Sequence, residues 1–344
     1  MRIVVFGAGG CVGGWICEKL ALRGDIDLVP CVRSWASAQR LARRGVVVQQ
    51  VDLEGADFPH QLLVGADAVI NAATLAPARE AELVARIYSG CVEAKVRRFV
   101  QFSSAVVYGK QTGDIGESAP LQPTDDYSAG KVNMERRLLK AALAAPAGSP
   151  QVFVLRPSIV YGPFAELWTI HYARRIAKGR WRSLGRAGAG TCNVVHVDDL
   201  AQAAILAASA EAAAGSHVLN VNGPEVVSWN EYIDRFGEAL GVAERTTPNY
   251  ILFDGATRAA NFVRTVGAWA KKIGLYSLIA ARPVSQDVKS FVSLYPYSEE
   301  MNLLRRKVLY SADLISKVLD YHPAMSLSDG LRQSADWCRV HGVT

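Results

Sequence analysis

Tyr127 and Lys131 are the residues whose types and spacing most directly predict chemistry in this chain. They stand four positions apart in the segment Tyr-Ser-Ala-Gly-Lys, and residues at that spacing share one face of a helix. An ammonium beside a phenol stabilises the ionised form of the phenol. An ordinary tyrosine has a pKa of about 10, so such a neighbour makes it usable as an acid or a base near neutral pH.

A glycine-rich turn follows the apolar run 3–6 and precedes the segment 15–22, whose apolar residues recur at helical spacing. Gly7, Gly10 and Gly13 follow the pattern G-x-x-G-x-x-G. The missing side chains let the backbone approach a pyrophosphate, and the N-terminus of the next helix faces its negative charge. A turn that serves packing alone is the alternative, but the order strand, turn, helix favours dinucleotide binding.

The second expected strand, 27–32, ends in Arg33 and Ser34, where many NAD-binding folds place an acidic residue that holds the ribose hydroxyls. Arginine offers instead a planar fork that can bind a 2′-phosphate and stack on adenine. We therefore expect NADP(H) as the preferred cofactor and NAD(H) as the alternative. An exposed arginine at a strand end, with no ligand, is the other interpretation.

Two further strands, 46–51 and 68–70, lead to Asp52-Leu53 and to Asn71-Ala72-Ala73. Ligands lie at the carboxyl edge of a doubly wound parallel sheet, so Asp52 is expected to cap the adenine amino group. The second segment is expected to pass beside the ribose and the phosphates. Ordinary turn chemistry is the alternative for both.

A strand at 98–102 is followed by Ser103 and Ser104, and with them the chain resembles the extended short-chain dehydrogenase/reductase superfamily. That group includes nucleotide-sugar epimerases, dehydratases, dihydroflavonol reductases and 3β-hydroxysteroid dehydrogenases. The motifs that carry the resemblance lie in family order between residue 3 and about residue 225: Gly7-x-x-Gly10-x-x-Gly13, Asp52-Leu53, Asn71-Ala72-Ala73, Ser103-Ser104-x-x-x-Tyr108-Gly109, Tyr127-x-x-x-Lys131, Arg156-Pro157 through Tyr161-Gly162-Pro163, and His196-Val197-Asp198-Asp199.

The resemblance implies a role for each matching residue. Ser104 hydrogen-bonds the reacting oxygen, Tyr127 is the acid or base, and Lys131 lowers the pKa of the tyrosine and holds the nicotinamide ribose. No metal is implied. The expected cofactor residues are Gly7, Gly9, Gly10, Cys11, Val12, Gly13, Arg33, Ser34, Asp52, Leu53, Asn71, Ala72, Ala73, Tyr127, Lys131, Pro157, Ser158 and Val160; the expected substrate contacts are Ser104, Val106, Ile159, Arg174 and Asn193.

The same motifs imply an α/β fold, with a Rossmann-type doubly wound parallel sheet and a smaller C-terminal substrate lobe. Residues 1–173 are expected to form mainly the NAD(P)-binding domain, and residues 174–344 mainly the substrate lobe. Elements around 192–222 are expected to return to the sheet.

Departures from the family pattern narrow the reaction. Dehydratases carry an Asp-Glu pair where this chain has Ala105-Val106, and aliphatic side chains cannot perform that proton transfer. Epimerases of sugar nucleotides place an asparagine and an arginine where Ile159 and Cys192 stand here, so the usual pyrophosphate clamp is incomplete. The arginines that could replace it are Arg174, Arg180, Arg305 and Arg306.

These departures favour an NAD(P)-dependent oxidoreductase that transfers hydride reversibly between its cofactor and the carbinol or ketone of a small organic substrate. The first alternative is a nucleotide-sugar 4-epimerase or 4-ketoreductase. The second is a non-catalytic dinucleotide-binding sensor or scaffold, which the presence of Ser104, Tyr127 and Lys131 disfavours.

Composition limits the other function classes. The chain has 344 residues, half of them hydrophobic, and its net charge of +6 comes from scattered basic residues, so no nucleic-acid partner is expected. Six cysteines without Cys-x-x-Cys spacing suit buried thiols in a reducing compartment. Met1 leads directly into a strand and no apolar run is long enough to cross a bilayer, so we expect a cytoplasmic protein.

Apolar residues between 262 and 276 alternate spacings of four and three, which predicts an amphipathic helix. Packing onto the substrate lobe or a partner subunit is the favoured interpretation. A lid over an apolar substrate and contact with a membrane surface are the alternatives. The family resemblance also implies a homodimer, formed by helices over 82–94 and 128–142.

Overall fold

The computed structural model describes residues 1–55, 58–178, 181, 184–211, 215–242, 250–272, 292 and 295–344. They form two units. The first comprises Met1–Ala165, Asn193–Glu225 and Leu309–Leu327, and the second comprises Glu166–Cys192, Val226–Val308 and Ser328–Thr344. The first unit therefore contains two later stretches of the chain besides its first 165 residues.

The first unit is built on a seven-stranded sheet in the order β11-β7-β5-β4-β1-β2-β3, whose pairs are all parallel. This confirms the expected doubly wound α/β fold. The strands are β1 (Arg2–Phe6), β2 (Asp27–Val32), β3 (Gln49–Gln50), β4 (Ala68–Asn71), β5 (Arg98–Phe102), β7 (Gln151–Pro157) and β11 (Ser216–Val221). The strand expected over 46–51 is reduced to β3, because it lies at the sheet edge, where Val47 is exposed.

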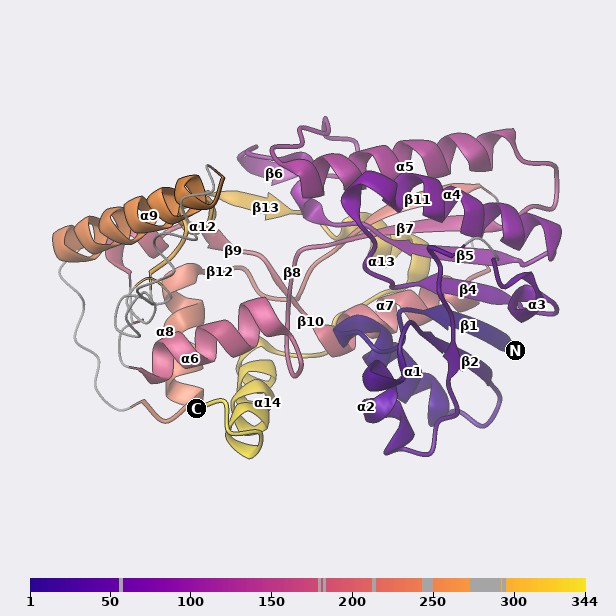
Figure 1. Cartoon of the computed structure of the whole chain (residues 1–344), viewed down its shortest axis with the longest axis horizontal. Helices are drawn as coiled ribbons and strands as arrows, with labels where there is room; N and C mark the ends of the chain where they lie inside the picture. The colour runs from indigo at the N-terminus through magenta and orange to yellow at the C-terminus, as the bar shows by residue number, and fades with distance from the viewer. Residues whose placement is uncertain are drawn as a thin grey trace. The chain divides into compact units, whose positions relative to one another are not determined.

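Alternate side chains of the strands pack into two cores, one on each face of the sheet. Helices cover both faces (Figure 1). In β1, Ile3 and Val5 join one core while Val4 and Phe6 join the other. The first core is covered by α1 (Cys11–Ala21), α7 (Val197–Ser209) and α13 (Asp313–Leu319). The second is covered by α4 (Pro77–Glu93) and α5 (Asp126–Ala144), which pack against each other.

Shorter elements complete this unit. The strands β8 (Ile159–Tyr161) and β10 (Val194–His196) form a separate parallel pair. The remaining elements are η1 (Trp35–Ala38), α2 (Gln39–Ala42), α3 (His60–Leu63), η2 (Ala105–Tyr108), β6 (Gly113–Ile115) and β13 (Val308–Tyr310), which pairs with β6.

The second unit has an aromatic core. Trp229 and Tyr232 of α8 pack around Tyr172 and Trp181, and all four side chains are buried. Ser228 caps α8 and forms a capping box with Glu231. The elements are η3 (Glu166–Ile170), α6 (His171–Ala177), η4 (Gly185–Gly188), β9 (Thr191–Cys192), β12 (Val227–Ser228), α8 (Trp229–Ala239), α9 (Tyr250–Lys272), α12 (Ser298–Arg305) and α14 (Leu327–Val340).

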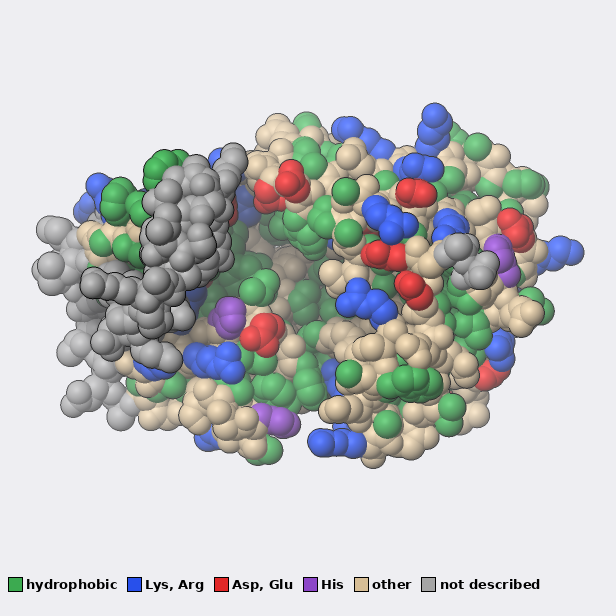
Figure 2. All heavy atoms as spheres, in the orientation of Figure 1, with side chains coloured by type: hydrophobic (Ala, Val, Ile, Leu, Met, Phe, Trp, Pro, Cys, Tyr) green, Lys and Arg blue, Asp and Glu red, His purple; other side chains and the backbone are tan. Residues whose placement is uncertain are grey.

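The amphipathic segment predicted at 262–276 lies in α9 as far as Lys272, and residues 273–276 fall outside the described part. Phe262, Val266 and Trp269 are exposed on this helix. No helix in the described ranges has the length and apolar character that a bilayer crossing requires. On the face drawn in Figure 2, Lys and Arg side chains are spread among acidic and apolar ones.

Candidate active site

The turn between β1 and α1 is shaped by close backbone approaches. Gly7 has a positive φ of 78°, and a Cβ there would lie 2.5 Å from the backbone of Ala72 and Ala73. A Cβ on Gly13 would lie 2.2 Å from the carbonyl oxygen of Gly7. Gly10 is the N-cap of α1 and supplies no side-chain cap, so the first N–H groups of the helix are available to an anion.

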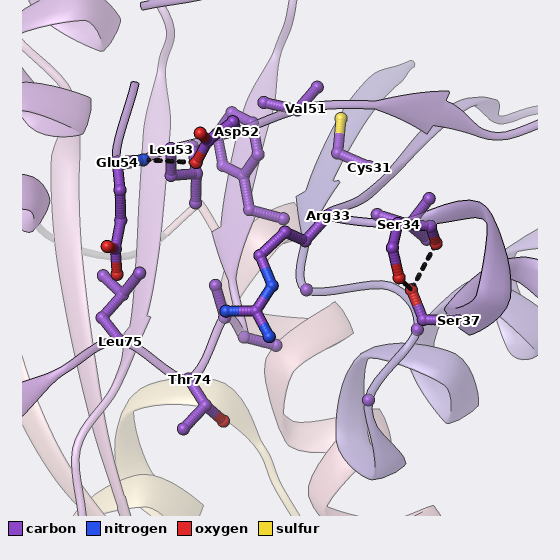
Figure 3. Close-up of a pocket in the computed structure, with 17 residues that line it drawn as sticks. Cys31, Arg33, Ser34, Ser37, Val51, Asp52, Leu53, Glu54, Thr74 and Leu75 are labelled. Carbon is purple, nitrogen blue, oxygen red and sulfur yellow. Dashed lines mark hydrogen bonds between the residues drawn. The ribbon is translucent and has the colours of Figure 1, made fainter. Parts of the chain in front are cut away.

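A hollow of about 250 Å³ lies beside this turn, at the carboxyl ends of β1, β2, β3 and β4 (Figure 3). Nine of the predicted cofactor residues line it: Gly7, Gly9, Gly10, Arg33, Ser34, Asp52, Leu53, Ala72 and Ala73. The hollow also includes residues that the sequence did not single out: Phe6, Cys31, Val32, Ser37, Val51, Glu54, Thr74 and Leu75. The structure brings Ser37 to the glycine turn, since its Cβ would lie 2.6 Å from a Cβ on Gly9.

Arg33 is exposed and its side chain extends into the hollow toward Thr74 (Figure 3). No ion pair of its guanidinium occurs among the described residues. Ser37 donates a hydrogen bond from Oγ to the carbonyl oxygen of Ser34 at 2.6 Å, and the two hydroxyl oxygens are 3.5 Å apart. One edge of the hollow therefore gathers a cation and two hydroxyl groups.

Two other predicted residues make turn contacts within the protein. Asp52 accepts a hydrogen bond on Oδ1 from the backbone N–H of Glu54 at 2.9 Å. Asn71 is fully buried, donates from Nδ2 to Oε1 of Gln101 at 2.8 Å, and accepts from the backbone N–H of Ala73 at 3.3 Å. Asn71 thus holds the backbone of Ala73 beside Gly7. The Asn71 side chain therefore shapes the hollow indirectly, by fixing the position of a backbone segment that lines it.

Tyr127 and Lys131 lie on the first two turns of α5, which begins with a capping box. Asp125 accepts from the backbone N–H of Ser128 at 2.7 Å, and the Ser128 hydroxyl accepts from the backbone N–H of Asp125 at 3.1 Å. Tyr127 is 46% exposed, and the Nζ atom of Lys131 lies 5.7 Å from the centre of its ring. The ammonium is thus within cation–π distance of the phenol ring.

Ser104 is half-buried and caps η2, because its Oγ accepts from the backbone N–H of Val106 at 3.3 Å. The short helix η2 packs against α5, so the structure brings the elements that carry Ser104 and Tyr127 together. Ser103 is 4% exposed, and its hydroxyl has no hydrogen-bond partner in the described part of the chain.

Lys131 has a partner that the sequence did not predict. Its Nζ lies 2.6 Å from Oε1 of Glu80 in α4 and also donates to the carbonyl oxygen of Phe102 at 3.4 Å. Glu80 is 2% exposed. A signal for it exists, since Glu80 shares a helix face with the buried residues Leu83, Val84 and Ile87, where a carboxylate needs a partner.

The segment after β7 lies against α1. The carbonyl oxygen of Pro163 accepts from Nε1 of Trp15 at 3.4 Å. Ser158 donates from Oγ to Oδ1 of Asn222 at 2.7 Å, and Oδ1 of Asn193 accepts from the backbone N–H of Tyr310 at 3.2 Å. Ser158, a predicted cofactor residue, and Asn193, a predicted substrate residue, therefore both make hydrogen bonds within the protein. Val160 and Ile159 are half-buried, and Val106 is 39% exposed.

Three of the four arginines considered as a pyrophosphate clamp lie in the described part of the chain. Arg174, Arg305 and Arg306 belong to the second unit, where Arg174 lies 3.9 Å from Glu166. Arg180 falls outside the described residues.

The Cys11 thiol and the His196–Asp199 motif are held by burial and by contacts within the protein. Burial raises the pKa of Cys11 to about 11, so its thiol stays neutral beside the turn. Burial lowers the pKa of His196 to about 4, against the opposite effect of the Asp198 carboxylate. Asp198 pairs with Lys19 at 2.8 Å, and Asp199 accepts from backbone N–H groups. Within the described ranges, no cluster of His, Cys, Asp or Glu could hold a metal ion.

A model of the NAD dependent epimerase/dehydratase family matches residues 3–222, which is more than half of the chain. The chain belongs to this family. It is thus a member of the extended short-chain dehydrogenase/reductase superfamily and uses a nicotinamide cofactor. The open N-terminus of α1 and the hollow that Arg33 lines fit the phosphates and a ribose of a dinucleotide. The Tyr127–Lys131 pair fits the proton transfer that accompanies hydride transfer at the nicotinamide end.

The chain is similar to curated proteins and to solved structures. An uncharacterized protein, y4nL, of Sinorhizobium fredii is 23% identical and covers 99% of this chain and 96% of its own. The 2-alkyl-3-oxoalkanoate reductase of Stenotrophomonas maltophilia is 26% identical over 70% of this chain and 76% of its own. The UDP-glucuronic acid 4-epimerase of Bacillus cereus, solved in complex with NAD, has a TM-score of 0.74 at 17% identity over 99% of each chain, and it shares the fold.

A Gly13→Ala variant should lose cofactor affinity. The new Cβ would lie 2.2 Å from the Gly7 carbonyl oxygen, so the turn must shift away from the hollow. We expect NADPH binding, followed by its fluorescence, to weaken by about tenfold or more, which corresponds to about 1.4 kcal/mol. Gly24→Ala, where a Cβ meets nothing within 4 Å, is the control. Equal affinity of the two variants would contradict this account of the turn.

Proposed function

We propose that this chain is an NADP(H)-dependent oxidoreductase that transfers hydride reversibly between the nicotinamide and a carbinol or ketone of a small organic substrate. The observation that carries the proposal is the buried ammonium of Lys131 beside the half-exposed phenol of Tyr127, at the start of a capped helix. A poised phenol supplies the proton that a carbonyl needs on reduction and removes it from a hydroxyl on oxidation.

Each of the three catalytic residues has a distinct task. Tyr127 exchanges the proton with the substrate oxygen. Ser104 donates a hydrogen bond to the same oxygen and polarises it without changing charge. Lys131 stabilises the phenolate and offers a donor to a ribose hydroxyl. The bound nicotinamide supplies or accepts the hydride. The other end of the dinucleotide suits the α1 N-terminus and the hollow beside it.

The preference for NADP(H) rests on Arg33. Its guanidinium has no ion pair among the described residues, and Arg33 lines the hollow together with Ser34 and Ser37 (Figure 3). These groups suit the charge and the oxygen atoms of a 2′-phosphate. A carboxylate that would select the ribose hydroxyls of NAD is not placed directly after β2.

The substrate is proposed to carry little charge. Ile159 and Cys192 offer no cationic or amide group to a pyrophosphate, and burial raises the pKa of the Cys192 thiol well above its ordinary value. A relative that covers 70% of this chain is named as a reductase of 2-alkyl-3-oxoalkanoates, whose carbonyl group is of the class proposed here.

A nucleotide-sugar 4-epimerase is the second candidate. Its support is the fold shared with the UDP-glucuronic acid 4-epimerase of Bacillus cereus over 99% of both chains. The same Tyr127 and Lys131 would serve it, because epimerisation oxidises and then reduces one carbon. Such an enzyme keeps its cofactor through the cycle, whereas a reductase exchanges it.

A Tyr127→Phe variant tests the acid/base role. We expect turnover of a ketone panel, followed by NADPH absorbance, to fall by about 10²- to 10⁴-fold, the usual contribution of such a group. The phenol is 46% exposed and its hydroxyl makes no hydrogen bond among the described residues, so the melting temperature should not change. Near-normal turnover in a folded variant would remove Tyr127 from the mechanism.

An Arg33→Asp variant tests the cofactor preference. Losing the cation and adding a negative charge should weaken NADPH binding by about ten- to a hundredfold and leave NADH binding little changed. Arg43→Asp is the matched control, because Arg43 is exposed in the same region and does not line the hollow. If both variants keep the wild-type ratio of NADPH to NADH affinity, Arg33 does not read the cofactor.

The cofactor carried by the purified protein separates the two candidate functions. A reductase should release little cofactor on denaturation and should bind added NADPH reversibly. A 4-epimerase should release NAD close to one per chain. Chromatography of the denatured supernatant measures both, and stoichiometric NAD would favour the epimerase over the proposed reductase.

A further inference from the structure

We propose that Glu80 is a positioning residue of this site: it holds the Lys131 ammonium in place and limits how strongly that ammonium stabilises the Tyr127 phenolate. The inference rests on the proposed function, because it takes Tyr127 as the acid or base. Glu80 itself acts only through Lys131.

Glu80 and Lys131 form a short, buried ion pair. Glu80 is 2% exposed, its Oε1 lies 2.6 Å from Nζ of Lys131, and the lysine side chain is 9% exposed. A lysine ammonium has three N–H donors. One points to Glu80 and one reaches the carbonyl oxygen of Phe102 at 3.4 Å, so one remains without a partner among the described residues. Lys131 therefore has a single donor left for a ligand hydroxyl.

The two helices approach closely where the pair forms. A Cβ on Gly130 would lie 2.9 Å from Cβ and 3.0 Å from the carbonyl oxygen of Pro77, so only glycine lets α5 pack against the start of α4. Pro77 opens α4 and Glu80 lies in its first turn, where the helix dipole favours a negative charge. The close approach thus places a carboxylate opposite the residue that follows Gly130.

Glu80 is the counter-ion of the Lys131 ammonium, because the other charged groups named below are paired with each other or exposed. The elements packed against α5 are α4, η2 and β7. From β7, Arg156 pairs with Glu135 of α5, and from η2 the Tyr108 hydroxyl accepts from Arg156. Asp126 is exposed in the first turn of α5 itself. Because Glu80 is 2.6 Å from the ammonium, it offsets much of the positive field that reaches the phenol.

A Glu80→Gln variant isolates this effect. The amide oxygen can still accept from Lys131, but the counter-charge is gone, so the ammonium should stabilise the phenolate more strongly. We expect the midpoint of Tyr127 ionisation to move to lower pH by about one unit. The near-ultraviolet absorbance of tyrosinate, taken as the difference between each enzyme and its Tyr127→Phe counterpart, measures this without a substrate. An unchanged or higher midpoint would overturn the proposal.

Glu135→Gln is the matched control. Glu135 is 1% exposed, lies on α5 and pairs with Arg156 at 2.6 Å rather than with Lys131. It should lower the melting temperature without moving the Tyr127 midpoint. An equal shift in both variants would mean that any buried charge loss perturbs the tyrosine, and would overturn the specific role of Glu80.

A second pair of variants keeps the proposal testable if Glu80→Gln does not fold. Lys131→Met leaves the Glu80 carboxylate buried without its partner, and Glu80→Met combined with Lys131→Met removes both charges. The double variant should melt above Lys131→Met and still lack turnover. A double variant that melts no higher would show the two groups to be uncoupled, against the proposal. Failure of the proposed function is seen separately, as turnover retained by Tyr127→Phe.

Discussion

A buried ammonium must have a partner, and the pairing of Lys131 with Glu80 constrains much of the first unit. Removing one member of a buried pair costs about 3–5 kcal/mol, because the other charge is left without compensation. The pair at 2.6 Å needs α4 and α5 in close contact, which requires Gly130 against Pro77. It also needs the end of β5 at the same place, because the Phe102 carbonyl accepts from the ammonium. Ser104, the serine proposed to face the substrate, follows the last residue of that strand by two positions.

A second buried network supports the loop that carries Ser104. Arg156 binds Glu135 at 2.6 Å and donates to the Tyr108 hydroxyl at 2.8 Å, and that hydroxyl donates to Asn220 at 2.7 Å. Burial acts to lower the pKa of Arg156, but the Glu135 carboxylate more than offsets it, and the pKa lies above its ordinary value. These hydrogen bonds connect η2 to β7 and β11 and, through Arg156 and Glu135, to α5. Three other elements therefore hold the short helix η2, which follows Ser104. The residues proposed as catalytic lie on elements whose charged side chains are paired within the protein, which is what preorganisation requires.

The parts of this site that could be predicted from sequence are those whose cause is local. The glycine turn follows from three glycines between a strand and a helix, and the Tyr127–Lys131 contact follows from a spacing of four. Glu80 could not be assigned in that way, because its partner is 51 residues away and meets it only after the sheet places α4 beside α5. The same holds for Asn71, whose amide binds Gln101 across β4 and β5. The strand expected at 46–51 was too long because edge position, not side-chain type, decides how much of it is paired.

The strand order separates cofactor selection from proton chemistry. The sequence of strands reverses direction between β1 and β4, and in such sheets a dinucleotide lies across that point. The residues of the hollow follow β1, β2, β3 and β4, whereas Ser104 follows β5 and Tyr127 lies on the helix that packs beside it. None of the three residues proposed as catalytic lines the hollow. If Arg33 reads the cofactor as proposed, a change there would alter which dinucleotide binds and leave the Glu80–Lys131–Tyr127 contacts as they are, so cofactor choice and proton transfer could vary independently in this fold.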